Sequence, residues 1–300
     1  MKTRFAAYRR RSPGVFQITI NAAFLIYSAI CLGPLLLVLG CSLSRESDVL
    51  SSGYRLIPLN FTTDAYRFLL GNGRELFQAY FYTVFSTIAG TALGVIIMAA
   101  LAYPMSRKDF RPRNKFSFYV YLTMLFNGGM VPLYLVYTQL IPIKNSILAL
   151  ILPNMLGGFY TLLMKNFFAQ NIPESVVESA EIDGATTYRI FFTMVLPLSK
   201  PVLVTVGLFS AIAYWNDFFR NMLLANNGII NNLQYLLYRI TVQIQVINQN
   251  PDVAASFPGG IPNETARMAM AILVVIPIAV LFPLIQKHFV RGLVAGAVKG

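Results

Sequence analysis

The sequence is poor in charge and poor in the residues that enzymes use. Only 12% of its 300 residues are charged, against roughly 25% in soluble globular domains, which excludes an ordinary soluble domain. It has one histidine, His288, and contains no HExxH, CxxC or GxSxG motif and no GxxxxGKS or GxxxxGKT phosphate loop. These motifs carry metal, redox, nucleophilic and nucleotide chemistry. We therefore expect no catalytic residue, no bound cofactor and no metal site in this chain.

Cysteine is almost as scarce. Cys31 and Cys41 lie ten residues apart in one apolar run, which we expect to be helical. At that spacing on a helix the two side chains cannot form a disulfide. We interpret both as small buried hydrophobic residues.

Long uncharged apolar runs account for most of the chain, which is 56% hydrophobic. Most of them exceed the roughly 18 residues that a membrane span requires. The run 201–216 is shorter and reaches that length only if Asp217 faces protein or water. We predict an all-α integral membrane protein with a single transmembrane domain, 1–300. Its six expected helices span approximately 14–43, 77–105, 116–142, 146–168, 201–222 and 267–287.

The basic residues predict the orientation of these spans. With six spans, 16 of the 24 lysines and arginines fall on one side, in segments 1–12, 106–116, 165–200 and 287–300. Positively charged loops stay in the cytoplasm, so both termini are expected there, and the basic N-terminus begins an uncleaved first helix. Because the bases lie in short clusters between apolar runs, the net charge of +12 does not indicate a nucleic-acid partner. The basic turn 106–115 is expected to touch anionic membrane lipid.

The segment 170–200 has the pattern of two short helices on a membrane surface. Pro173 and Glu174 suit a first helical turn, and Gly184 suits the end of that helix. A second helix is expected to begin at Thr186 or Thr187. Three apolar residues are expected to share one face of the first helix: Val176, Val177 and Ala180. Pro197 and Pro201 are expected to bound the exit of the second helix.

Three stretches of the sequence resemble a known family. The residues Glu178–Ala180, Asp183–Ala185, Leu196–Pro197 and Pro201 resemble the EAA loop of bacterial ABC importer permeases. The tail Gly292–Gly300 is similar to that of the maltose-type second permease subunit. The run Phe126–Pro132 is similar to the subgroup that imports complex or acidic saccharides. One departure is Ser179, where the family usually has alanine.

The resemblance implies a type I ABC importer permease fold in the bacterial inner membrane. It implies a second homologous permease, a dimer of ATPase subunits that bind ATP and magnesium, and an extracytoplasmic solute-binding protein. The implied cargo is an oligosaccharide, with acidic alginate or aldouronate fragments as the first expectation. Implied contacts to the ATPase come from Glu178, Ser179, Ala180, Asp183, Gly184 and Ala185 in the coupling loop. In the cytoplasmic tail, 288–300, they come from Ala295, Gly296, Ala297, Val298, Lys299 and Gly300. Without the resemblance, the residues of the loop slightly favour a solvated amphipathic turn.

Polar residues near the end of the fifth expected span are candidates for the translocation path. A charge in hydrocarbon costs roughly 2.5–3.5 kcal/mol, so such residues need water or a protein partner. The candidates are Tyr214, Trp215, Asn216, Asp217, Arg220 and, in the preceding span, Asn154. The alternative is an interfacial aromatic belt with a local ion pair between Asp217 and Arg220. The following outer loop, 223–265, is rich in amides, which suit contact with a sugar or its binding protein.

Two other classes of membrane protein were considered. An ion-coupled secondary transporter would need intramembrane acids and inverted repeats with broken helices. The sequence offers only Asp217 and shows no repeat. An integral membrane enzyme is disfavoured by the missing nucleophile and metal motifs.

Overall fold

The computed structural model describes residues 15–71, 73–249 and 263–297. Within these ranges the chain is helical, and its β-structure is limited to one isolated bridge between Ser44 and Phe61. The chain divides into two compact units. One consists of Met1–Leu69 with Pro251–Ile272, and the other of Leu70–Asn250 with Leu273–Gly300.

The first unit contains the helix α1, Val15–Ser42, whose apolar side chains are largely exposed. It continues through α2, Glu46–Ser52, and α3, Asp64–Gly71, so the segment between the first two expected spans has helices of its own. Cys41 is buried as expected, whereas Cys31 is exposed. The last helix, α16, spans Glu264–Ala297 and begins in this unit.

A carboxylate from α2 caps the start of α16. Glu46 accepts hydrogen bonds from the backbone N–H groups of Glu264 and Thr265, each at 2.9 Å. The first N–H groups of a helix lack partners within the helix, and its amino end favours negative charge. Tyr54 adds a hydrogen bond to Glu264 Oε2 at 2.9 Å. This contact ties the segment after α1 to the first turn of the last helix.

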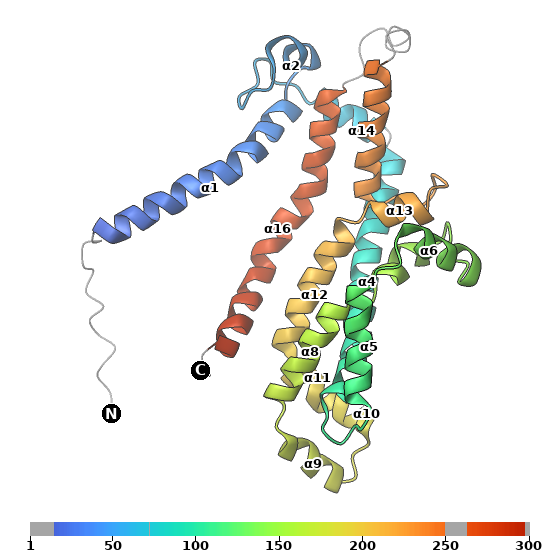
Figure 1. The fold of residues 1–300 in the computed structure, drawn as a ribbon. Coiled ribbons are helices and arrows are strands. Elements are labelled where there is room, and N and C mark those ends of the chain that lie inside the picture. The colour runs from blue at the N-terminus through green and yellow to red at the C-terminus, as the bar shows by residue number, and fades with distance from the viewer. Residues whose placement is uncertain (1–14, 72, 250–262, 298–300) are drawn as a thin grey trace. The chain divides into compact units, whose positions relative to one another are not determined.

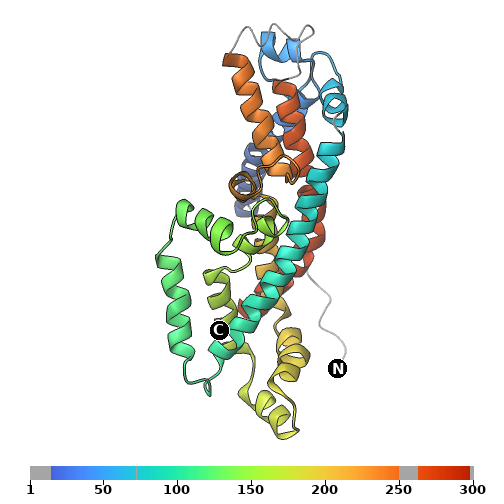
Figure 2. The ribbon, with the colours of Figure 1, turned by 90° about the vertical axis from the view of Figure 1, so that its right-hand side faces the viewer.

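The second unit is built on α4, Gly73–Ser106. Two helices pack along it, α12 (Lys200–Trp215) and α8 (Gly158–Asn171), as Figures 1 and 2 show. Two glycines one helical turn apart allow α12 and the segment just before α8 to approach α4 closely. A Cβ atom on Gly90 would lie 2.3 Å from the ring of Tyr214, and one on Gly94 would lie 2.7 Å from the carbonyl oxygen of Met155. The GxxxG spacing of these glycines is a known signal for helix packing in membranes.

Several helices of this unit are broken. The helix α5, Arg113–Leu125, is followed after a break by α6, Met130–Leu135, and the π-helical turn η1, Val136–Leu140, with a bend of 114°. At the break Gly129 has a φ of 86° and donates its N–H to Asn127 Oδ1 at 2.9 Å. The glycines there thus break the helix, and the expected span 116–142 is not one continuous helix.

The next two expected spans are also interrupted. The helix α7, Leu148–Ile151, with the 3₁₀ turn η2, Leu152–Asn154, meets α8 at a bend of 54°. The run expected at 201–222 ends as a helix at Trp215, where Asn216 Nδ2 donates to the Ile212 carbonyl at 2.9 Å. Two further helices follow, α13 at Phe219–Leu224 and α14 at Leu233–Gln249.

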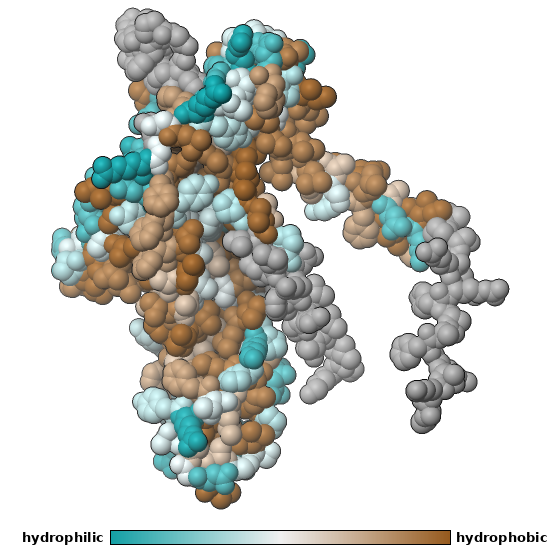
Figure 3. Space-filling model, turned by 180° about the vertical axis from the view of Figure 1, so that it is seen from behind, coloured by the Kyte–Doolittle hydropathy of each residue, from teal (hydrophilic) through white to brown (hydrophobic). Residues whose placement is uncertain are grey.

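These breaks change how spans are counted. Among the described residues, two helices, Phe16–Ser42 and Gly73–Ser106, are long and apolar enough to cross a membrane alone. The number rises to five if each of three bent pairs is one span. The sixth expected span, 267–287, lies within α16. Apolar side chains dominate the face of the molecule seen in Figure 3, as expected of a surface that meets lipid or other apolar protein. The helical class is confirmed, while the number six and the position of the termini stay predictions.

Candidate functional site

The segment after α8 folds as the sequence predicts. The helix α9, Glu174–Ile182, begins directly after Pro173. Val177 and Ala180 are buried in a core cluster that includes Tyr103 of α4 and Phe168 of α8. Val176, expected on the same face, is 38% exposed. Neighbouring residues on a helix point about 100° apart, so Val176 and Val177 cannot both face the centre of one contact.

Two backbone hydrogen bonds end α9. The Ala185 N–H donates to the Ala180 carbonyl at 2.9 Å, and the Gly184 N–H donates to the Glu181 carbonyl at 3.0 Å. Gly184 has a φ of 78°. This is the Schellman arrangement, in which a glycine takes the left-handed conformation and the two flanking apolar residues meet. Ala180 and Ala185 both pack on the core cluster, so the predicted helix stop at Gly184 is confirmed.

The second helix of the loop is also where it was predicted. Thr186 is the N-cap of α10, Thr187–Ile190, and its Oγ1 accepts a hydrogen bond from the Arg189 N–H at 3.4 Å. The chain continues as the π-helical turn η3, Phe191–Val195, and a short helix, α11, Leu196–Leu198. It then bends by 80° into α12. The bend lies between the two prolines expected to bound it.

The six residues expected to couple to an ATPase fall into two groups. Ala180 and Ala185 face the core, and Gly184 forms the turn, so these three shape the loop. Glu178, Ser179 and Asp183 are exposed. The Ser179 hydroxyl donates back to the Ser175 carbonyl. Glu178 forms no hydrogen bond or ion pair with any other described residue, so its carboxylate is available to a partner.

Two large apolar residues of this loop, which the sequence analysis did not single out, are exposed. Ile182 is 86% exposed at the end of α9, and Tyr188 is 81% exposed on α10. They flank the glycine turn along the chain. The signal that could have found them is their position off the apolar face that Val177 and Ala180 define.

Two ion pairs connect α9 to the turn after α4. Arg107 Nη2 lies 3.0 Å from Glu181 Oε1, and Lys108 Nζ lies 2.7 Å from Glu174 Oε2. Asp109 also binds Arg107, at 2.9 and 3.0 Å, and this hydrogen bonding holds the pKa of Asp109 below its ordinary value. The first two bases of the turn are therefore engaged with acids rather than free for lipid.

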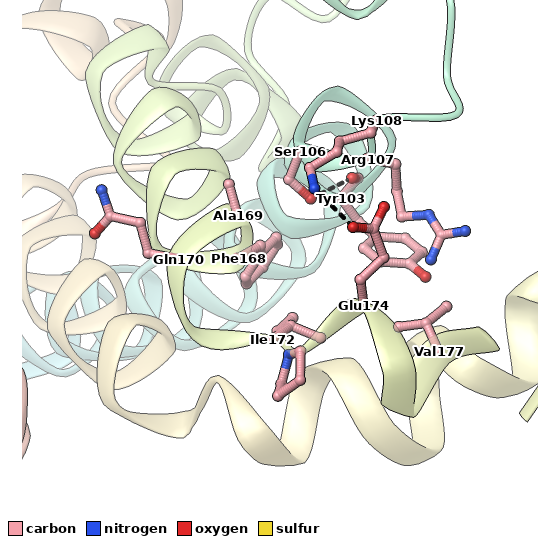
Figure 4. Close-up of a pocket in the computed structure, with 11 residues that line it drawn as sticks. Tyr103, Ser106, Arg107, Lys108, Phe168, Ala169, Gln170, Ile172, Glu174 and Val177 are labelled. Atoms are coloured by element: carbon pink, nitrogen blue, oxygen red, sulfur yellow. Dashed lines mark hydrogen bonds and ion pairs between the residues drawn. The ribbon is translucent and has the colours of Figure 1, made fainter. Parts of the chain in front are cut away.

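A cavity of about 260 Å³ lies beside the second ion pair (Figure 4). Phe168, Ile172 and Val177 contribute apolar lining, and Lys108 and Glu174 are among its charged residues. Every lining residue from α9 belongs to its first half. Within α9, the pocket therefore borders only the amino-terminal half.

The translocation-path candidates from Tyr214 to Arg220 lie together at the end of α12 but are held by bonds within the chain. The Tyr214 hydroxyl donates to the Ile151 carbonyl at 2.7 Å, and Trp215 Nε1 donates to the Val274 carbonyl at 3.2 Å. The suggested ion pair is present, with Arg220 Nη1 at 3.2 Å from Asp217 Oδ2. Asn216 is exposed and accepts from Gln234 at 3.0 Å. Asn154 lies in the 3₁₀ turn after Ile151.

Asn231 and Asn232, in the outer loop whose amides were expected to contact sugar or its binding protein, are buried, and so is the neighbouring Asn221. Asn232 caps α14, since its Oδ1 accepts from the Tyr235 N–H at 2.8 Å, and its Nδ2 donates to the Asp217 carbonyl. Asn221 Nδ2 donates to the Ala225 and Ile230 carbonyls at 2.6 and 2.9 Å. Asn231 is 2% exposed and donates to the Gly228 carbonyl at 3.0 Å. Buried amide N–H groups need acceptors, and here backbone carbonyl oxygens of the same chain supply them. The Oδ1 atom of Asn231 is buried without a hydrogen-bond partner among the described residues.

The remaining expectations concern the tail and metal binding. Ala295, Gly296 and Ala297 form the end of α16, while Val298, Lys299 and Gly300 lie outside the described residues. Across the part of the chain that the structure describes, no group of three or more His, Cys, Asp and Glu residues is arranged to hold a metal ion.

Comparison with known proteins gives consistent matches. Residues 95–294 match the family model described as "Binding-protein-dependent transport system inner membrane component". The polygalacturonan/rhamnogalacturonan transport system permease protein YtcP of Bacillus subtilis is 37% identical over 287 residues, which cover 95% of this chain and 99% of the relative. Protein LplC of the same organism is 34% identical over 91% of this chain and 90% of its own length.

A solved structure is similar as well. It is a chain from the crystal structure of a bacterial ABC transporter involved in the import of the acidic polysaccharide alginate. The TM-score is 0.78 at 28% sequence identity, with 96% of this chain and 100% of that chain covered.

Proposed function

Because this chain belongs to the binding-protein-dependent transport system inner membrane components and is the permease of a sugar or oligosaccharide ABC importer, we propose that its cargo is an acidic oligosaccharide. The similarity to the polygalacturonan and alginate systems supports this, since both of those polymers are built from sugar acids. An arabinooligosaccharide permease of Bacillus subtilis is less similar, at 25% identity. The family assignment rules out the ion-coupled secondary transporter considered above.

The proposal includes an ATPase that docks on the α9–α10 loop. The permease is the non-catalytic membrane subunit, so partner subunits bind ATP and magnesium and hydrolyse the nucleotide. Exposed Ile182 and Tyr188 give the loop an apolar contact, and unpaired Glu178 gives it a charge that a basic partner residue can meet. Protein interfaces commonly have an apolar core enriched in aromatic residues and a polar rim, and these residues could supply both. The tail from Ala295 to Gly300 would add a second contact.

A second permease and a solute-binding protein complete the proposed complex in the bacterial inner membrane. The exposed apolar side chains of α1 and α5 suit burial against a second permease or lipid. On α14, Gln243 and Gln245 are exposed amides beyond the buried Asn232 cap, so they replace Asn231 and Asn232 as candidates for contact with the binding protein or sugar.

The cargo is tested by deleting the gene for this chain in its own bacterium. Uptake of labelled oligogalacturonates, alginate oligosaccharides and arabinooligosaccharides is then compared before and after deletion. We expect uptake of one acidic oligosaccharide class to be lost and to return with the intact gene. Loss of arabinooligosaccharide uptake alone would contradict an acidic cargo and leave the permease assignment in place.

A further inference from the structure

We propose that α9 rotates during transport about the Arg107–Glu181 ion pair, which stays formed and which we call the hinge. The Lys108–Glu174 ion pair at the other end of α9 breaks during this rotation, and we call it the latch. This inference rests on the proposed docking of an ATPase on the α9–α10 loop. The two ion pairs reach the same helix from adjacent residues of one turn, and they engage opposite ends of α9. Their surroundings differ in three ways.

The first difference is burial. The Arg107 side chain is 18% exposed, and Asp109 fixes its guanidinium through two hydrogen bonds while Nη2 also reaches Glu181. Lys108 is 75% exposed, and it binds Glu174 through a single flexible ammonium group. A planar guanidinium held by several oxygens keeps its geometry, whereas an exposed lysine pair contributes little and is screened by salt.

The second difference is packing beneath the helix. The 260 Å³ cavity borders Pro173, Glu174 and Val177 but no residue of α9 beyond Val177 (Figure 4). This pocket is partly open to solvent, so the residues that border it have fewer protein neighbours on that side than residues of the close-packed interior. The first turn of α9, 174–176, is exposed and lies next to this pocket, so it can move with little loss of packing.

The third difference is the backbone. At the carboxyl-terminal end, Ala180 and Ala185 pack on the core and are joined by the 2.9 Å hydrogen bond of the glycine turn. At the amino-terminal end the helix begins at Pro173, without a side-chain cap. A load applied to the exposed face of α9 would thus turn it about the Glu181 end.

The hinge also determines which helix receives the movement of α9. Arg107 directly follows the last residue of α4, and α4 is the helix against which both α12 and α8 pack. A pull on Glu181 is therefore transferred to the end of α4 through this charged contact, in addition to the apolar packing of Val177 and Ala180 on the α4 side chains. Without the charged contact, less of the movement of α9 would reach α4.

Cross-linking separates the two roles because the expected effects have opposite signs. In a chain with Cys31 and Cys41 replaced by alanine, one variant carries Arg107→Cys with Glu181→Cys and the other carries Lys108→Cys with Glu174→Cys. Each is assembled into the complete transporter in proteoliposomes with its binding protein. Uptake per ATP hydrolysed is measured before and after a short, reducible thiol cross-linker is added.

Before cross-linking, the hinge variant should show about tenfold lower uptake per ATP hydrolysed, a loss within the range that one charged hydrogen bond can account for. After cross-linking, its uptake per ATP hydrolysed should recover. The latch variant should transport normally until it is cross-linked and then stop, with recovery after reduction. Inhibition of both variants by cross-linking, or of neither, would contradict the assigned roles of the two ion pairs.

Co-purification of the ATPase is recorded for each variant. Failure of the unmodified chain to retain an ATPase would instead contradict the proposed docking.

Discussion

At the scale of single residues, Glu178 differs from the other acids of α9. Glu174 and Glu181 are occupied by bases of the same chain, whereas Glu178 has no partner among the described residues. We expect Glu178→Lys to abolish coupled uptake while the protein still inserts and assembles. A charged hydrogen bond at an interface contributes about 1.5–3 kcal/mol, so affinity for the ATPase should fall roughly 10–100-fold.

Binding of the ATPase to detergent-purified permease measures this effect. Glu178→Gln is the matched control, since it keeps the size and removes only the charge, and it should give an intermediate loss. Unchanged uptake by Glu178→Lys would show that Glu178 is merely a solvated residue.

Residue-scale predictions from the sequence succeeded where neighbours along the chain determine the geometry. Gly184 takes a positive φ because the helix end requires it, and Pro173 and Thr186 occupy helix starts for equally local reasons. They failed where distant contacts decide. Nothing local to Asn232 reveals that the Asp217 carbonyl lies beside its amide. Its burial was therefore missed.

At the scale of helices, the glycines of α4 determine how closely its neighbours approach. We expect Gly94→Ala to destabilise the α4 contact by about 1–3 kcal/mol, because the added methyl would meet a backbone carbonyl that cannot move aside easily. Thermal unfolding of the purified permease measures this change.

The control is Gly207→Ala on α12. Its new Cβ would lie 3.8 Å from side-chain atoms of Thr91 and Val95, which is ordinary contact. It should leave stability nearly unchanged. Equal stability of the two variants would mean that the α4 glycines have no packing role.

Helix existence was predictable from apolar runs, but helix continuity was not. No charged residue lies between Leu125 and Met130, although the helix axis bends by 114° there. The Gly128–Gly129 pair was the available signal. Glycine adopts a positive φ without steric cost, and the φ of 86° at Gly129 is incompatible with a continuous α-helix. The Gly90–Gly94 spacing was a second signal, and it identifies the packing face of α4.

At the scale of the whole molecule, the charge bias predicts which ends of the helices face the cytoplasm. Single cysteines test this in a chain lacking Cys31 and Cys41. A membrane-impermeant thiol reagent should label Gln245→Cys in intact cells and should label Ile182→Cys only after permeabilisation, because both positions are exposed in the structure. Labelling in the reverse order would invert the orientation and remove the ATPase dock from the cytoplasm.

The π-helical turn η3, Phe191–Val195, has an evolutionary consequence. A π turn contains more residues than an α turn, and each residue of an α-helix adds about 100° of rotation. Loss or gain of one codon between Gly184 and Ser199 would therefore rotate everything that precedes the bend relative to α12. In this loop natural selection should therefore remove changes of length, even where it tolerates conservative changes of side chain.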